Sequence, residues 1–287
     1  MTEPVRFLVA ESEPPRAREE RRESVGNSAG ETYVETLLAL APGAVCDRVM
    51  PADRGAEWPD PAGLGSYDAV FLTGSPLHLY ENTPEVARQV AFMRAVFASG
   101  TPAFGSCAGL QVATVAAGGS VRPNGREAGF ARRITPTEAG LAHPLLAGRP
   151  KAYDAPSIHS DEVETLPEGA TLLAQNAVTG VQAAEIRRGE GVFWGVQYHP
   201  ELSLGEVAAA LERQADDLIE SGLAHSREAI EAQAALIAAL AREPERRDLA
   251  WRLGLDREVT EPARRMTELS NFIERLAKPR RSERGRA

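Results

Sequence analysis

The sequence contains few cysteines and lacks long apolar runs. Its 287 residues include two cysteines, Cys46 and Cys107, which are too few for a framework of disulfides. The early part of the chain shows no signal peptide, and no stretch of about twenty apolar residues marks a membrane span. We therefore predict a protein of the reducing cytoplasm that has no membrane partner.

Motifs for metals and for nucleotides are missing as well. The histidine, cysteine and acidic residues show no spacing typical of a zinc site. No glycine-rich motif of the phosphate-binding type appears in the chain. We therefore predict no metal and no cofactor, and any ATP-dependent step would have to occur on another protein.

Positive charge is also scarce. The formal net charge is −9, which argues against a nucleic-acid partner. The exception is the stretch 279–287, which carries four arginines and is predicted to be a disordered, solvated tail. With 25% charged and 43% hydrophobic residues, the composition is that of an ordinary soluble globular protein.

The most informative segment is Gly-Ser-Cys-Ala-Gly-Leu-Gln at residues 105–111. It follows an apolar strand and opens into a helix, and the pattern Gly-x-nucleophile-x-Gly is typical of a nucleophile elbow. Gly105 and Gly109 would remove side chains that collide with neighbouring elements. The helix dipole and free backbone N–H groups would stabilise a Cys107 thiolate. By itself, the segment fits an inert packing cysteine equally well.

A second segment supports the catalytic interpretation. Residues 192–198 are rich in β-branched and aromatic side chains and predict a strand that runs into His199-Pro200-Glu201. A cysteine nucleophile needs a base, and histidine has a suitable pKa. Glu201 could fix the tautomer of His199 if Pro200 makes the turn rigid. A lone His-Pro-Glu would more simply end a strand and begin a helix.

Together these segments resemble the class I glutamine amidotransferase family. The likeness is nearest to the amidotransferase half of GMP synthase and its stand-alone relatives, and it covers about residues 5–222. Three further stretches match the family's order: a glycine-rich oxyanion loop, a Glu-x-Gly-type segment and a segment like His-Gly-Asp-x-Val, at residues 72–76, 126–129 and 159–163.

The resemblance implies a role for each catalytic residue. Cys107 would attack the side-chain amide of glutamine, form a γ-glutamyl thioester and release ammonia. His199 would move the proton, and Glu201 would orient His199. Backbone N–H groups of Ala108 and near Gly74 would form the oxyanion hole.

The resemblance also implies two substrate-binding residues. Gln111 and Asp161 would hold the α-amino and α-carboxylate ends of the substrate, although their spacing alone favours a solvent-facing helix residue and a turn. The chain departs from the family's pattern at Ser106, Ala108 and Ser160. A glycine in place of Ser160 would permit a positive φ, which serine adopts only at a cost.

The remaining pattern predicts an α/β fold. We expect a mostly parallel central sheet flanked by helices, the flavodoxin-like class I amidotransferase fold, with a site at the carboxyl ends of the strands. Residues 11–30 are predicted to be a long charged loop. Strands are expected at 5–10, 68–73, 102–105, 130–137, 171–175, 183–187 and 191–198, and helices at 31–40, 84–99, 204–220, 226–242, 244–254 and 261–276.

We predict an amidotransferase domain over residues 1–222 and a helical C-terminal extension over 223–287. The extension would pack on the chain's own surface, or it would dock a synthetase partner or a second copy of the chain in a homo-oligomer. Three functions stay open: a glutamine amidotransferase that delivers ammonia to an acceptor enzyme, a stand-alone γ-glutamyl amide hydrolase with the same triad, and a non-catalytic scaffold. The intact set of Cys107, His199 and Glu201 argues against the scaffold.

Overall fold

The structure, a computed structural model, describes residues 3–283 except for the side chains of residues 124–126. The Arg126 side chain of the predicted Glu-x-Gly-type segment therefore lies outside the described part. Within this range the chain forms a nine-stranded sheet with the order β2-β1-β3-β4-β9-β8-β7-β5-β6. The strands are β1 (Arg6–Ala10), β2 (Val45–Val49), β3 (Ala69–Leu72), β4 (Ala103–Ser106), β5 (Ser120–Pro136), β6 (Tyr153–Thr165), β7 (Ala170–Gln175), β8 (Ala183–Arg188) and β9 (Gly191–Val196).

The sheet is mixed, with as many antiparallel as parallel strand pairs, where the sequence predicted a mostly parallel sheet. The pairs that join β2, β1, β3, β4 and β9 in this order are parallel, and the pairs that join β9, β8, β7, β5 and β6 are antiparallel. Strands β3, β4 and β9 are buried along their whole length because helices cover both faces of the sheet there, whereas the edge strand β2 is only partly buried and carries Asp47 and Arg48. In β1, Phe7 and Val9 join one core while Leu8 and Ala10 join the core on the other face. The α/β class predicted from the sequence is confirmed.

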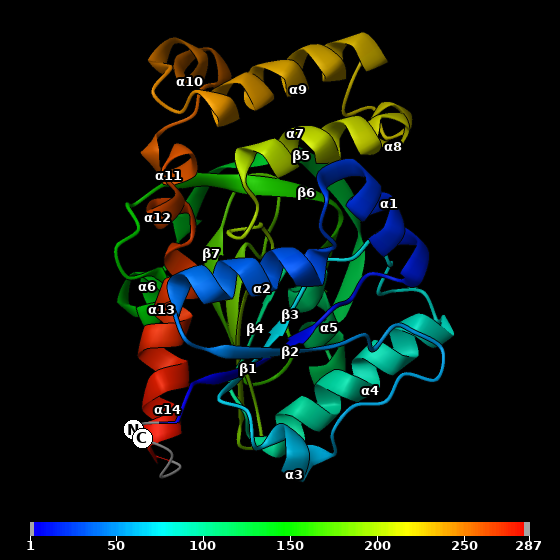
Figure 1. The fold of residues 1–287 in the computed structure, drawn as a ribbon, viewed down its shortest axis with the longest axis vertical. Coiled ribbons are helices and arrows are strands. Elements are labelled where there is room, and N and C mark those ends of the chain that lie inside the picture. The colour runs from blue at the N-terminus through cyan, green and yellow to red at the C-terminus, as the bar shows by residue number, and fades with distance from the viewer. Residues whose placement is uncertain (1–2, 284–287) are drawn as a thin grey trace.

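Helices surround this sheet (Figure 1). They are α1 (Pro15–Val25), α2 (Ala29–Leu40), α3 (Pro61–Leu64), α4 (Pro84–Ser99), α5 (Ala108–Ala117), α6 (Glu138–Ala142), α7 (Leu204–Arg213), α8 (Ala215–Glu220), α9 (Arg227–Arg242), α10 (Arg247–Leu253), α11 (Arg257–Thr260), α12 (Pro262–Arg265), α13 (Thr267–Phe272) and α14 (Lys278–Glu283). A 3₁₀ turn covers Pro144–Leu146, and a π-helical turn, Ile273–Ala277, joins α13 to α14. Among the described helices, none combines the length and apolar character needed to cross a membrane.

Helix α4 has the predicted bounds, and its ends explain why. The Thr83 side chain accepts a hydrogen bond from the backbone N–H of Val86, and Pro84 occupies the first turn. Gly100 ends the helix with φ of 66°, a left-handed conformation that glycine adopts without strain. Local capping signals therefore set both boundaries.

The prediction of a long loop over residues 11–30 is wrong. Most of the stretch forms α1, which begins at Pro15 and ends at Gly26 with φ of 86°. Its charged residues are paired: Arg18 contacts Asp53 at 2.6 Å and Arg21 contacts Glu206 at 2.9 Å. The many charged residues of this stretch favoured a loop in the sequence analysis. In the structure they belong to a helix that is held to the rest of the molecule by ion pairs and not by an apolar face.

Strands β2 and β6 were not predicted. The segment of β6 that holds His159, Ser160 and Asp161 is polar, so it lacks the apolar alternation of an ordinary strand. These polar side chains line or border the cavity described below. The strand pairs along its length with β5, which begins earlier than the predicted residue 130.

The predicted disordered tail is also wrong over its described part. Residues up to Glu283 continue as α14, and the guanidinium of Arg281 is buried. It contacts Asp68 at 3.4 Å and donates a hydrogen bond to the carbonyl of Glu3. Helix α14 therefore lies beside the start of β1 (Figure 1). Residues 284–287 lie outside the described range.

The C-terminal segment enters the main core, where the sequence predicted an extension outside it. The ring of Phe272 is fully buried, with centroids 5.3 Å from Phe71, 5.5 Å from Phe104 and 6.0 Å from Trp194. A separate apolar cluster, which includes Val207 and Leu211 of α7 and Ile230 and Ile237 of α9, packs α9 on α7. The domain boundary at residue 222 stays a prediction.

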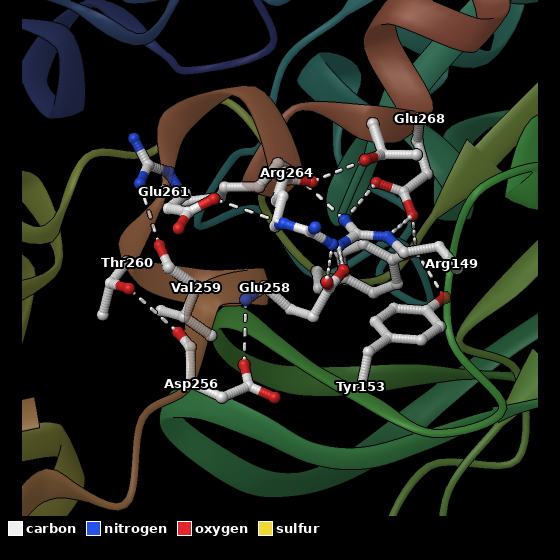
Figure 2. A network of polar contacts seen from close by, with 12 residues as sticks. Arg149, Tyr153, Asp256, Glu258, Val259, Thr260, Glu261, Arg264 and Glu268 are labelled. Atoms are coloured by element: carbon white, nitrogen blue, oxygen red, sulfur yellow. Dashed lines mark hydrogen bonds and ion pairs between the residues drawn. The ribbon is translucent and has the colours of Figure 1, made fainter. Parts of the chain in front are cut away.

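A buried ion-pair network anchors α11 and α13 (Figure 2). Arg149 donates hydrogen bonds to both carboxylate oxygens of Glu268 at 2.7 Å and to Glu258 at 2.8 Å. Burial by itself would lower the pKa of Arg149, but the charge of Glu268 raises it. Glu268 also accepts a hydrogen bond from the hydroxyl of Tyr198 at 2.9 Å. The C-terminal segment is thereby joined to the residue that precedes His199.

Candidate active site

The predicted elbow forms a sharp turn between β4 and α5. Cys107 has φ of 53° and ψ of −113°, a conformation that costs energy for a residue with a side chain. A Cβ at Gly105 would lie 2.9 Å from the backbone of Gly109, and one at Gly109 would lie 2.6 Å from the carbonyl oxygen of Leu72. The turn thus requires both glycines, as an elbow does. The N–H of Cys107 donates to Val196, which fixes the turn against β9.

His199 and Glu201 follow β9 and form a buried pair. Nδ1 of His199 lies 2.7 Å from Oε1 of Glu201, and the N–H of His199 donates to the carbonyl of Pro156 at 2.8 Å. Burial of the ring by itself would lower the pKa of His199. The negative charges of Glu201 and Cys107, with hydrogen bonds to both, outweigh that effect and raise the pKa to about 10. The contacts with Glu201 and Cys107 therefore favour the protonated imidazole.

These residues border one cavity of about 490 Å³ at the carboxyl ends of the parallel strands. Its position is the one expected for a site in an α/β sheet. The cavity walls include six of the seven residues predicted for the site: Gly74, Cys107, Gln111, Asp161, His199 and Glu201. Ala108 is buried directly behind Cys107. As the first residue of α5, it has a backbone N–H that no helical carbonyl satisfies.

Gly74 lies against the imidazole. A Cβ at this position would be 2.8 Å from Cε1 of His199, so a side chain here would displace the ring. Position 74 therefore brings backbone, without a side chain, next to the predicted catalytic groups. The predicted oxyanion roles of Gly74 and Ala108 are untested and stay predictions.

The two predicted substrate residues contact each other. Nε2 of Gln111 donates to the carbonyl oxygen of Asp161 at 3.0 Å. The side chain of Asp161 accepts from Nδ1 of His78 at 2.8 Å. Ser160 is not among the residues with positive φ, so the strain considered for it is absent. Gln111 is buried rather than facing solvent, and Asp161 lies in a strand rather than a turn.

A polar network supports this wall of the cavity. Glu127 contacts Nε2 of His159 at 2.9 Å and accepts from Gln182 at 2.8 Å. Burial would raise the pKa of Glu127, but these hydrogen bonds and the charge of His159 lower it. Nδ1 of His159 in turn lies 2.9 Å from the carbonyl oxygen of Asp161. The network fixes the β6 backbone that Gln111 contacts.

Sequence reasoning missed the part of the cavity formed by α1, α7 and α8. Glu13, Ala17, Arg21 and Arg213 line this end. Burial raises the pKa of Glu13, although Arg21 opposes the effect. One signal in the sequence could have indicated this part of the cavity: Glu13 comes just after β1, at the carboxyl ends of the parallel strands, where sites form in α/β sheets. Among the described residues, no group of three His, Cys, Asp or Glu side chains is arranged to hold a metal ion.

The chain is similar in sequence to proteins of one known family. Residues 48–216 match the family model "Glutamine amidotransferase class-I". The chain is 39% identical over 225 residues to a γ-glutamyl-L-1-hydroxyisopropylamide hydrolase of Pseudomonas sp., with 77% of this chain and 75% of that protein covered. It is 34% identical over 137 residues to the GMP synthase of Streptomyces coelicolor, with 47% of this chain and 24% of that protein covered.

A solved glutamine amidotransferase of Thermotoga maritima has the same fold. Its TM-score is 0.63 at 19% sequence identity, with 94% of this chain and 99% of that chain covered. The chain belongs to the class I glutamine amidotransferase family, and it is an enzyme of that family. The resemblance stated from the sequence is confirmed.

The His199 cation gives a prediction that needs no substrate. In His199→Asn we expect alkylation of Cys107 by iodoacetamide at pH 7 to slow by about tenfold or more, because the thiolate loses its cationic partner. Glu201→Gln should have a milder effect, since Glu201 orients the ring without taking the proton. The measurement is the alkylation rate between pH 5 and about pH 10. An unchanged profile in His199→Asn would show that the two side chains are not paired.

Proposed function

We propose that the chain hydrolyses γ-glutamyl amides through a glutamyl thioester on Cys107, with glutamine as the smallest member of this substrate class. The observation that carries the proposal is the buried His199–Glu201 pair beside a strained Cys107 in a single cavity. The named hydrolase relative supports the choice of amides with a substituent on nitrogen.

The reaction would proceed in two halves. The Cys107 thiolate attacks the side-chain carbonyl carbon, and the C–N bond breaks while the His199 cation gives its proton to the leaving nitrogen. Water then attacks the thioester with His199 as base, and glutamate and the free thiol result. Glu201 keeps the imidazole in one orientation throughout, and the N–H of Ala108 with backbone near Gly74 would stabilise the negative oxygen.

The substrate's two ends would lie in different parts of the cavity. We place the glutamyl end against Gln111 and Asp161, where the polar network of β5 and β6 fixes the wall. The leaving amine would extend toward α1, α7 and α8. That end is lined by Ala17, Ala210 and Leu218 and offers apolar surface that ammonia would not need.

A matched pair of variants tests the placement of the leaving group. Ala17→Phe should lower kcat/KM for γ-glutamyl isopropylamide by about tenfold or more and leave glutamine within about twofold, because the added ring occupies space that only the alkyl group uses. Ala87→Phe on α4 is the control, since Ala87 is exposed and lies outside the cavity. Equal losses for both substrates would contradict this placement.

A second candidate is delivery of ammonia to an acceptor enzyme. The observation in its favour is a GMP synthase subunit of Methanoculleus marisnigri that is 36% identical over 104 residues, with 36% of this chain and 54% of that protein covered. The partner would be a synthetase or a second copy of the chain. Trp251 on α10 is 84% exposed and marks a surface for such a contact.

The two candidates differ in one assay of the purified chain. Fast turnover of the isopropylamide without any partner favours the hydrolase. Slow turnover of glutamine alone, stimulated by an added synthetase and lost in Trp251→Asp, favours ammonia delivery.

A further inference from the structure

Two buried hydroxyl groups lie behind the carboxylate of Glu201. Ser106 is the last residue of β4, is fully buried, and donates from Oγ to Oε1 of Glu201 at 3.0 Å. Tyr33 of α2 is also fully buried, and its hydroxyl is hydrogen-bonded to Oγ of Ser106. The result is a chain of contacts from α2 through β4 to Glu201, in the segment that follows β9.

The protons in this chain can be assigned. A serine hydroxyl has one proton, and the carboxylate of Glu201 accepts but does not donate. Because the proton of Ser106 goes to Glu201, Tyr33 must donate its own proton to Ser106. Burial, followed by the charge of Glu201, raises the pKa of Tyr33 well above its usual value, which keeps this donor protonated.

Glu201 depends on these contacts to an unusual degree. Its Oε1 accepts from both His199 and Ser106, whereas its Oε2 is buried and has no hydrogen-bond partner among the described residues. Without Ser106, the carboxylate would be held by His199 alone and could rotate. The ring of His199 would then lose its fixed orientation toward Cys107.

We propose that Ser106 and Tyr33 are positioning residues that hold Glu201, and through it His199, in the geometry that the thioester reaction requires. The proposal rests on the proposed function, since it assumes that Cys107, His199 and Glu201 act together. It gives a physical reason for a serine at position 106. Tyr33 acts only through Ser106.

Three variants test this arrangement, with alkylation of Cys107 as a readout that needs no substrate. In Ser106→Ala we expect kcat for γ-glutamyl isopropylamide to fall about tenfold at nearly constant KM, which corresponds to about 1.4 kcal/mol. Alkylation of Cys107 at pH 7 should also slow, because an imidazole whose orientation Glu201 no longer fixes pairs less well with the thiolate. Tyr33→Phe should give a smaller change in the same direction.

The double variant tests whether Tyr33 acts through Ser106. Ser106→Ala/Tyr33→Phe should match Ser106→Ala alone, since the tyrosine has no further route to Glu201. Thr114→Val is the control, because it removes another buried hydroxyl, whose hydrogen bond goes to the carbonyl of Leu110 within α5. It should leave both readouts unchanged.

Two results would overturn the proposal. If Ser106→Ala changes the free energy of unfolding in urea but leaves kcat and the alkylation profile unchanged, the hydroxyls serve the fold only. If the losses in the two single variants add in the double variant, Tyr33 does not act through Ser106. A failure of the proposed substrate would be seen separately, as absent isopropylamide turnover with an intact alkylation response.

Discussion

Cys107→Ala is expected to abolish hydrolysis of glutamine and of γ-glutamyl amides, with residual activity below about a thousandth of the starting rate. Removing the nucleophile prevents the thioester and leaves only binding and stabilisation of the oxyanion. The fold should persist, because alanine is smaller than cysteine and fits the space between Gly105 and Gly109. Turnover assays and a urea unfolding curve measure the two effects separately.

Cys46→Ala is the matched control. Cys46 lies in β2, does not line the cavity, and is partly buried. Burial, with the nearby charge of Asp47, raises the pKa of its thiol to about 11, so it stays protonated at neutral pH. We expect normal turnover. Activity of Cys107→Ala near that of Cys46→Ala would show that another group carries the reaction.

Phe272→Ala is expected to cost about 3–5 kcal/mol of the free energy of unfolding, because it opens a cavity between three aromatic side chains of the main core. The loss would be large relative to the stability of an ordinary domain. Trp251→Ala is the control, since that side chain is exposed and its removal should change stability by about 0.5 kcal/mol or less. Urea denaturation of the full chain gives both values.

The same packing predicts that a chain ending at Gly222 will not fold cooperatively. It would lack Phe272, and the guanidinium of Arg149 would lose both of its carboxylate partners, Glu258 and Glu268. A cooperative unfolding transition in the truncated chain, with normal turnover, would show that the C-terminal helices are an independent extension. Equal stability of Phe272→Ala and Trp251→Ala would likewise contradict the assigned packing.

The sequence predicted the elements whose signals are local. Helix α4 has a capping threonine and a terminal glycine, and the elbow needs Gly105 and Gly109 for reasons visible in the motif itself. The parallel strands β1, β3, β4 and β9 were predicted because burial on both faces makes them largely apolar, whereas the partly buried edge strand β2 lacks that signal and was missed. The family resemblance then supplied the order of the site residues along the chain.

The parts that the sequence did not predict depend on contacts between distant residues. Helix α1 appeared to be a loop because its arginines are paired with Asp53 and Glu206, which lie far along the chain. Strand β6 carries polar residues for the cavity and therefore lacks the alternation of a strand. The role of the C-terminal segment depends on Arg149 and Phe71, and no local pattern in residues 267–277 could indicate those partners.

The most direct test of the account is to search for the covalent intermediate. Purified chain mixed with γ-glutamyl isopropylamide and quenched in acid within the first turnovers should yield a peptide in which Cys107 carries one glutamyl group, as read by mass spectrometry. The same peptide should be unmodified in Cys107→Ala, and it should accumulate the adduct more slowly in His199→Asn. Steady release of the amine with Cys107 unmodified at every time, or with the glutamyl group on another side chain, would contradict the proposed reaction.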